Sequence, residues 1–149
     1  MEQYYTDERN VQILISLLKE HGIKRVVASP GSTNVTFVGS LQQDPYFEMY
    51  SCVDERSAAY MAVGMAAETG EPVVLSCTGA TASRNYYPAL TEAYYRQLPI
   101  LAVTSTQEES KIGHMLPQVI DRRQQPFDTV RMSVHMQTVK DEDDEWNCV

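Results

Sequence analysis

Short apolar stretches alternate with amphipathic stretches along most of the chain, a pattern typical of strands that alternate with helices. Strands are predicted at 25–29, 48–53, 72–77 and 99–105, because each is a short run rich in apolar residues and bounded by turn-forming residues. The run PVVLSC at 72–77 has too little alternation for a face in water, which suits the interior of a parallel sheet. The pattern predicts an α/β fold with an open, mostly parallel sheet and helices on both faces.

Helical stretches are predicted between these strands. Thr6, followed by Asp7 and Glu8, predicts a helix start with a capping hydroxyl and acids in the first turn, and Gly22 ends the apolar periodicity that follows. The stretch that ends at Gly70 is so poor in charge that both of its faces look buried. The further helices are predicted at 35–43, 53–70 and 83–96.

The remainder of the chain is less regular. Residues 106–129 are predicted to form a long loop with a helical turn at 119–124, and the partial alternation at 130–139 predicts a last strand. The final run DEDDEWNCV begins an acid-rich first helical turn and then stops. We therefore divide the chain into one domain at 1–140 and the start of a truncated helix or linker at 141–149. A frayed acidic tail is the alternative.

The composition predicts one globular domain. Hydrophobic residues make up 43% of the 149 and aromatic residues 9%, which is enough for a single core. A net charge of −8 argues against nucleic acid as a partner, and no apolar window approaches the roughly 20 residues that a bilayer requires. Without a basic, apolar leader the expected location is cytoplasmic. The three cysteines are far apart and lack a CxxC pair, so we expect no disulfide framework and no structural zinc.

Four turns follow the carboxyl ends of the predicted strands, where open parallel sheets bind their ligands. One turn is charged, Asp54-Glu55-Arg56, and three are small and hydroxylated. A flat polar ring between small residues, with a carboxylate facing it, fits this set better than a phosphate group does. Neither a G-x-x-x-x-G-K motif nor a G-x-G-x-x-G after the first strand is present. The hydroxylated turns are 29–34, 78–81 and 105–107.

The residues around these turns carry a family resemblance. The run from CVDERSAAY to ILAVTS (52–105), with ASPGST before it and MLPQVIDRRQQPF after it, resembles the N-terminal pyrimidine-binding (PYR) domain of thiamine-diphosphate-dependent enzymes. It is most similar to the branch that holds the menaquinone-pathway SEPHCHC synthase, acetolactate synthase and the 2-oxoacid decarboxylases. The resemblance implies the thiamine-diphosphate-binding fold, thiamine diphosphate as cofactor, and decarboxylation or carboligation of a 2-oxo acid.

The resemblance implies a catalytic role for Glu55. In the family the glutamate at this position hydrogen-bonds a ring nitrogen of the aminopyrimidine, which favours the imino tautomer that deprotonates the thiazolium carbon to the ylide. An apolar pocket favours the protonated carboxyl that this exchange needs, and residues 57–69 supply apolar surroundings. From the residues alone, Glu55 could instead stabilise the helix dipole and pair with Arg56 at the surface.

The resemblance also implies other contacts. Thr78 and Gly79 match the turn beside the pyrimidine ring, although plain turn residues would look the same. Gln118 matches a glutamine that reaches the reaction centre, with a solvated loop residue as the alternative. The implied cofactor-binding residues are Glu55, Thr78, Gly79, Pro30 and Gly31, and the implied substrate residues are Ser32, Thr33 and Gln118.

The chain departs from the menaquinone branch at three places. Thr33 stands where that branch has an arginine that binds a substrate carboxylate, and the S-G-T-A turn reads T-G-A-T. The basic A-D-R-P segment is replaced by Ser105-Thr106-Gln107-Glu108. The loss of cationic groups predicts a substrate other than isochorismate.

The resemblance also implies that this chain is half of an active site. The family holds the cofactor's diphosphate through a metal ion in a separate domain marked by G-D-G, and no G-D-G occurs here. The acids at 141–145 form one charge run rather than a spaced ligand set, so Mg²⁺ is expected only in the missing domain or subunit. We expect a homodimer or larger homo-oligomer, inactive without that domain, as a piece of a longer polypeptide or a small subunit. The alternative is a non-catalytic α/β binding or interaction module.

Overall fold

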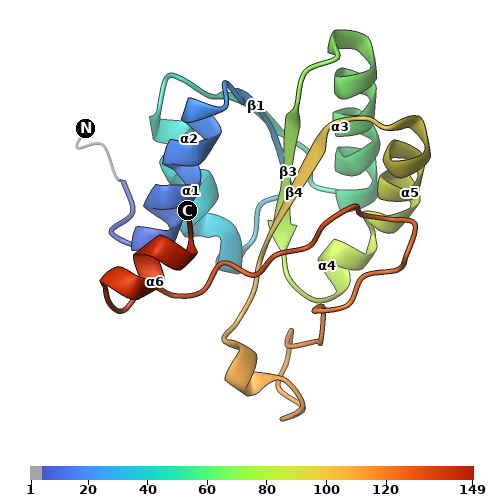
Figure 1. The fold of residues 1–149 in the computed structure, drawn as a ribbon. Coiled ribbons are helices and arrows are strands. Elements are labelled where there is room, and N and C mark those ends of the chain that lie inside the picture. The colour runs from blue at the N-terminus through green and yellow to red at the C-terminus, as the bar shows by residue number, and fades with distance from the viewer. Residues whose placement is uncertain (1–4) are drawn as a thin grey trace.

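A parallel sheet between two layers of helices forms the body of the protein, in a computed structural model that describes residues 5–149 (Figure 1). The strands lie in the order β2-β1-β3-β4, and every neighbouring pair is parallel. The α/β fold class and all four predicted strands are confirmed, with strand ends shifted by one or two residues. The strands are β1 (Arg25–Ala28), β2 (Glu48–Ser51), β3 (Val73–Thr78) and β4 (Ile100–Ser105).

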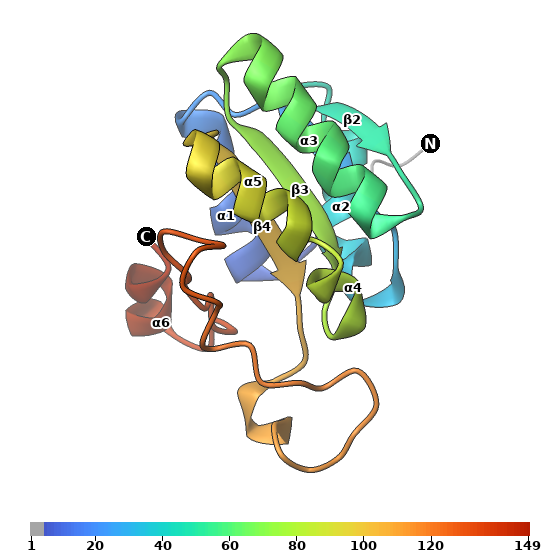
Figure 2. The same ribbon diagram turned by 90° about the vertical axis from the view of Figure 1, so that its right-hand side faces the viewer.

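The two helical layers cover opposite faces of the sheet, as Figures 1 and 2 show. On one face lie α1 (Arg9–Glu20) and α2 (Val35–Gln43), and on the other lie α3 (Glu55–Thr69) and α5 (Tyr87–Arg96). The bounds of α2 agree with the predicted helix at 35–43. The shorter elements are α4 (Thr81–Arg84), α6 (Glu142–Asn147) and the 3-10 turns η1 (Ser32–Asn34) and η2 (Glu109–Lys111).

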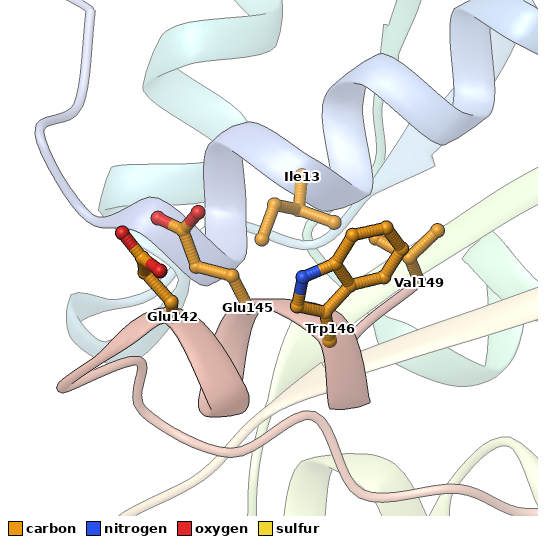
Figure 3. A pocket seen from close by; sticks show the side chains of 5 residues that line it. All are labelled: Ile13, Glu142, Glu145, Trp146 and Val149. Atoms are coloured by element: carbon orange, nitrogen blue, oxygen red, sulfur yellow. The ribbon is translucent and has the colours of Figure 1, made fainter.

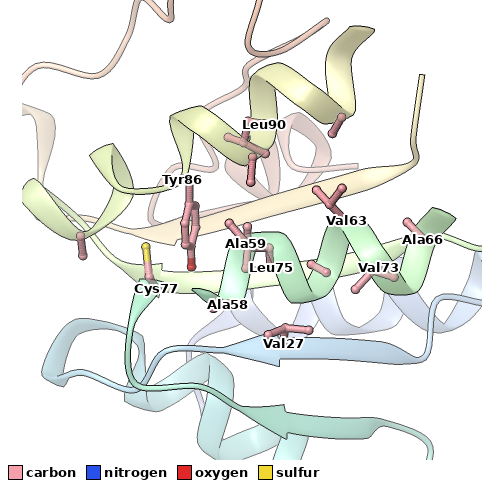
Figure 4. Close-up of a cluster of buried hydrophobic side chains, with 14 residues drawn as sticks. Val27, Ala58, Ala59, Val63, Ala66, Val73, Leu75, Cys77, Tyr86 and Leu90 are labelled. Atoms are coloured by element: carbon pink, nitrogen blue, oxygen red, sulfur yellow. The ribbon is translucent and has the colours of Figure 1, made fainter. Parts of the chain in front are cut away.

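Each face of the sheet has its own apolar core. Successive side chains of a strand point to opposite faces, so Val26 packs towards α1 and α2 while Val27 packs towards α3 and α5. On β3, Val74 and Leu75 divide in the same way, and Figure 4 shows the cluster beneath α3 and α5. Burial of β3 on both faces explains why its sequence lacks alternation.

Helix α3 begins and ends on side-chain and backbone caps. The Asp54 carboxylate accepts a 2.7 Å hydrogen bond from Ser57 N, and Gly70 closes the helix at φ 69°, a left-handed conformation that favours glycine. The predicted burial of both faces is wrong for this chain. One face is a buried alanine-rich stripe, while Tyr60 and Met61 on the other are 44% and 42% exposed.

Two predicted helix boundaries need correction. Helix α1 begins at Arg9 rather than at Thr6, because buried Thr6 accepts a 3.1 Å hydrogen bond from Glu8 N ahead of the helix. The predicted helix at 83–96 is divided into α4 and α5. Pro88 has no N–H and its ring would clash with the carbonyl of Arg84, so one helix ends there and the next begins around the proline.

Two predictions in the last third of the chain are also wrong. Residues 119–124 contain no helix, and the nearest helical turn is η2. Residues 130–139 form no strand, because none of their backbone pairs with the neighbouring strand β4, and Met132 and Val134 are exposed to solvent. The acid-rich helix start near 141 is confirmed, since Asp141 caps α6 through a 2.9 Å bond from Asp144 N. The domain division at 140 stays a prediction.

The helices of residues 5–149 are too short or too polar to cross a lipid bilayer.

Candidate functional site

The carboxyl ends of β1, β3 and β4 lie at one edge of the sheet. Figure 2 shows β3 and β4 ending at this edge, near α4 and the loop that follows β4. The chain places the turns 29–34, 78–81 and 105–107 there, and the first turn of α3 reaches the same edge. This arrangement follows from the parallel sheet, in which all strand-to-helix turns lie at one end. It brings together the hydroxylated turns and the charged turn.

Gly31 and Thr78 are in close contact at this edge. A Cβ atom at Gly31 would overlap Thr78 Cγ2, so the first turn can approach the end of β3 only with glycine at this position. Asn34, which is buried, holds the turn in place: its Oδ1 accepts from Gly31 N at 2.9 Å and its Nδ2 donates to Ser29 O at 3.1 Å. The predicted contact residues Gly31 and Thr78 therefore lie side by side.

Gly79 provides a second close approach. A Cβ atom there would lie 2.8 Å from the Ser105 carbonyl oxygen and 3.6 Å from Nη2 of Arg122. The turn after β3 thus packs directly against the turn after β4, and a guanidinium from the long loop lies beside both. Glycine is needed because any larger residue would push these two turns apart.

Glu55 is the first residue of α3 and is half-buried. Its Oε2 accepts a 3.2 Å hydrogen bond from Asn85 Nδ2, and this is its one hydrogen bond among residues 5–149, so Oε1 is unengaged there. The capping bond to the helix backbone comes from Asp54, and no ion pair joins Glu55 to Arg56 within the described chain. The carboxylate is therefore not used as a side-chain cap or in a surface ion pair.

The Cys77 thiol lies within range of two opposite charges. Burial raises its pKa to about 11, and the neighbouring charges of Glu55 and Arg122 move that pKa in opposite directions. Tyr86, almost fully buried, lies beside Cys77 (Figure 4), and burial raises its pKa as well. Both groups stay neutral near pH 7.

The other predicted site residues are placed less centrally. Pro30 and Ser32 are exposed, and Gln118 is exposed with φ 60° on the loop after η2. Thr33 is half-buried, and its Oγ1 is shielded from solvent without a hydrogen-bond partner among the described residues. The fold therefore brings Glu55, Gly31, Thr78 and Gly79 to one edge and leaves Gln118 on the surface.

Two hollows are candidates for ligand binding. The larger, about 1060 Å³, runs along β4 between the sheet and the segment 129–138 and is lined by Thr33, Arg122 and the turn 105–107. The smaller, about 360 Å³, lies between α1 and α6, where Trp146 packs near Ile13 (Figure 3). Of the predicted site residues, Thr33 lines the larger hollow and none lines the smaller one, so the larger hollow borders the candidate edge at Thr33, Arg122 and the turn 105–107. Within residues 5–149, no group of three or more His, Cys, Asp or Glu side chains is arranged to hold a metal ion.

A comparison with known protein families identifies this arrangement. Residues 9–127 match the model of the thiamine pyrophosphate enzyme, N-terminal TPP binding domain. The chain belongs to this family. The family implies thiamine diphosphate as the cofactor, and the TPP-binding domain spans the sheet, α3 and the long loop.

Relatives with established names are similar over most of this TPP-binding domain. The 2-succinyl-5-enolpyruvyl-6-hydroxy-3-cyclohexene-1-carboxylate synthase (SEPHCHC synthase) of Bacteroides thetaiotaomicron is 38% identical over 97% of the chain, which is 26% of that relative. The synthase of the same name from Porphyromonas gingivalis is 45% identical over 70% of the chain and 18% of the relative. The chain spans about a quarter or less of the length of these curated relatives.

Solved structures share the fold of the TPP-binding domain. A thiamine diphosphate-dependent 4-hydroxybenzoylformate decarboxylase from Rhodococcus jostii RHA1 is 26% identical, with a TM-score of 0.66 over 73% of this chain and 20% of that one. Benzoylformate decarboxylase from Polynucleobacter necessarius, at 22% identity, has the same fold with a TM-score of 0.65 over 73% of this chain and 20% of that one. The predicted resemblance is confirmed.

Sequence reasoning missed several residues of the TPP-binding domain that shape this edge. Asn85 and Arg122 are separated along the chain from the turns they contact, and no local pattern marks them. Asn34 lies within the predicted turn 29–34, but its part in holding that turn was not predicted. The only signal for Asn34 was its place after a Pro-Gly turn, where asparagine is common because its side chain bonds to nearby backbone.

Proposed function

We propose that this domain binds the pyrimidine end of thiamine diphosphate and that Glu55 activates it for reaction with a 2-oxo acid. The observation that carries the proposal is the state of the Glu55 carboxylate, which is half-buried, held at Oε2 by Asn85 and unengaged at Oε1 among the described residues. A carboxylate with one free oxygen at a rim of small residues fits an aminopyrimidine ring better than it fits an anion.

The surrounding residues support this fit. Gly31 lies against Thr78, and Gly79 lies against the Ser105 carbonyl, so the edge of the sheet that carries Glu55 is built from small groups. We propose that Thr78, Gly79, Pro30 and Gly31 contact the ring, and that Ser32, Thr33 and Gln118 lie towards the substrate. The exposed positions of Pro30, Ser32 and Gln118 leave them free to meet a ligand or a partner domain.

The proposed work of Glu55 is to hold and move a proton at Oε1. When bound, thiamine diphosphate supplies a carbon nucleophile that adds to a 2-oxo acid. Asn85 donates to Oε2 and so fixes the rotation of the carboxyl group, which leaves Oε1 directed to a single partner. The apolar stripe of α3 excludes water from one side of that carboxyl group.

A second domain or subunit completes the proposed site. We propose that the diphosphate and its Mg²⁺ are bound by that other part, since no group of three or more His, Cys, Asp or Glu side chains among residues 5–149 is arranged to hold a metal ion. We propose that the chain alone is inactive. We also propose that a second copy of the chain covers Tyr60 and Met61. Both side chains lie on α3, the helix that carries Glu55, and both are exposed in the single chain.

We propose a 2-oxo acid as the substrate and an acceptor other than isochorismate. The synthases among the relatives act in forming a cyclohexene carboxylate, and the structural neighbours act on benzoylformates, which are 2-oxo acids. Thr33 and Gln107 stand in this chain where the synthase branch is basic, so the acceptor is expected to differ.

Replacement of Glu55 tests the proposal. Proton exchange at the thiazolium C2 carbon is followed by NMR, with the chain combined with the diphosphate-binding domain that the proposal requires. Glu55→Gln should slow this exchange by about a hundredfold to ten-thousandfold, the range of general acid–base contributions. Glu68→Gln, near the other end of α3 and exposed, is the matched control and should leave the rate unchanged. Equal rates for both variants would favour the non-catalytic binding module instead.

A further inference from the structure

Arg122 is a half-buried guanidinium at the same edge of the sheet as Glu55. Its Nη2 lies 3.6 Å from the position of a Cβ atom at Gly79, and it lines the larger hollow together with Ser105 and Thr106. The loop after β4 therefore places a positively charged side chain beside the turns that form the candidate site. The turn residues and Glu55 do not explain why a cation is there.

Hydrogen bonds join the backbone around Arg122 to the neighbouring helices, and the Arg122 side chain takes no part in these bonds. Gln125 Nε2 donates to the Arg122 carbonyl oxygen at 2.6 Å, and the Tyr87 hydroxyl donates to Gln125 Oε1 at 2.9 Å. Arg84 donates to the Tyr87 hydroxyl at 2.8 Å and to the Asp121 carbonyl oxygen at 3.4 Å. The loop is thus anchored to α4 and α5 in a way that positions the Arg122 guanidinium without using it.

Arg122 has no counter-ion among residues 5–149. None of the ion pairs there includes it, and the adjacent Asp121 carboxylate is taken by Arg123 at 2.7 Å. Burial lowers the pKa of Arg122, and the charge of Arg84 lowers it further. A partly desolvated guanidinium without a partner is costly, although this chain has 20 acidic residues that could have paired with it.

A second polar group in the same hollow is also without a partner. Thr33 Oγ1 is shielded from solvent and makes no hydrogen bond among the described residues. Thr33 lies in η1, which packs against the ends of β3 and β4, and it lines the hollow that Arg122 lines. Thr33 and Arg122 both line this hollow, and a hydroxyl and a guanidinium are donor types that bind an anionic oxygen group.

We propose that Arg122 binds a carboxylate of the 2-oxo acid substrate, with Thr33 Oγ1 as an additional donor. This inference rests on the proposed function, because it assigns the substrate's anionic group to a named residue of the same site. The planar guanidinium can donate two parallel hydrogen bonds to one carboxylate, which suits recognition of an anionic group over a neutral one. Arg122 thereby supplies the positive charge that Thr33 and Gln107 do not.

Binding of 2-oxoglutarate to the 149-residue chain, measured by calorimetry without cofactor, tests this role. Arg122→Gln should weaken binding about tenfold or more, since a charge-assisted pair is lost. Arg123→Gln is the control: it removes the same charge at the next residue, where the guanidinium is already paired with Asp121 at the surface, and it should change binding less than twofold. Arg122→Lys should be intermediate, because it keeps the charge and loses the planar fork. An equal effect of Arg122→Gln and Arg123→Gln, or no binding by the parent chain, would overturn the proposal.

If Arg122→Gln fails to fold, chemical labelling of the parent protein tests the same role. Phenylglyoxal labels arginine side chains, and mass spectrometry reports the label at each position. We expect 2-oxoglutarate to slow labelling of Arg122 and not of Arg123, and the neutral dimethyl ester of 2-oxoglutarate to protect neither. Equal labelling of Arg122 with and without 2-oxoglutarate would contradict the inference. Glu55→Gln should still bind 2-oxoglutarate, so a failure of the Glu55 test with intact Arg122 dependence overturns the proposed function alone.

Discussion

Asn85 Nδ2 donates a 3.2 Å hydrogen bond to Glu55 Oε2 across a separation of 30 positions in the sequence. The bond joins the first residue of α3 to the turn between α4 and α5. It exists because α4 ends before Pro88, which leaves Asn85 in a turn whose side chain can reach the neighbouring helix. The break that divides the predicted helix at 83–96 is therefore what supplies a partner to Glu55.

Removal of this partner should have a measurable effect on stability. Asn85→Ala deletes one part-buried hydrogen bond and should lower the free energy of unfolding by about 0.5–1.5 kcal/mol. Asn85→Asp should cost more at pH 7, because it places a second carboxylate beside Glu55. Urea denaturation at pH 7 measures both effects. Asn147→Ala, at an exposed helix end, is the control, and a similar loss there would contradict a specific role for Asn85.

The contact between Gly31 and Thr78 predicts a rescue experiment. Gly31→Ala should destabilise the protein by about 1–3 kcal/mol, because the added methyl overlaps Thr78 Cγ2. Thr78→Ser removes that Cγ2, so the double variant should recover much of the loss, and a double-mutant cycle gives the coupling. Gly39→Ala, in the open interior of α2, should be neutral or stabilising by up to about 1 kcal/mol. Additive single effects in the cycle would show that this contact does not require glycine.

The buried thiol predicts selective reactivity and an alkaline limit. With its pKa raised to about 11 by burial, Cys77 should react with a disulfide reagent at pH 8 far more slowly than the half-buried Cys52 and Cys148. The folded pKa lies above the ordinary value of 9.0, so the contribution of Cys77 to stability is present below pH 9 and is lost as pH rises towards about 11. Thermal unfolding of the parent and of Cys77→Ala between pH 8 and pH 11 checks this. A parallel decline of both proteins would rule out the thiol as its source.

The exposed face of α3 predicts self-association. Met61→Glu places a charge in the proposed contact with a second copy and should shift the protein towards monomer, raising the dimer dissociation constant at least tenfold. Sedimentation velocity over a range of concentrations measures this shift. Met132→Glu is the control. It makes the same change at a more exposed methionine in the segment 129–138, away from α3, and should leave association unchanged. A parent protein that is monomeric at all concentrations would contradict the proposed copy.

Much of the fold was predictable from sequence because its signals are local. Each strand is a short apolar run between turn residues, and α2 was predicted with its observed bounds, since periodicity and flanking turns act over a few residues. The parallel sheet also predicted that the turns at 29–34 and 78–81 would meet, as Gly31 and Thr78 do. The start of α1 was missed because Thr6 bonds to Glu8 N ahead of the helix, an arrangement that resembles a cap in sequence.

The sequence by itself determined the order of strands and helices, the family and the acid at the start of α3. Only the tertiary structure decided that Asn85 contacts this acid and that Arg122 lies beside Gly79, because pairings between distant residues leave no periodic signal in one sequence. The same limit applies to 130–139, whose alternation predicts a strand. A strand forms only where a neighbouring edge accepts its hydrogen bonds, and in this chain the free edge of β4 is left unpaired among the described residues.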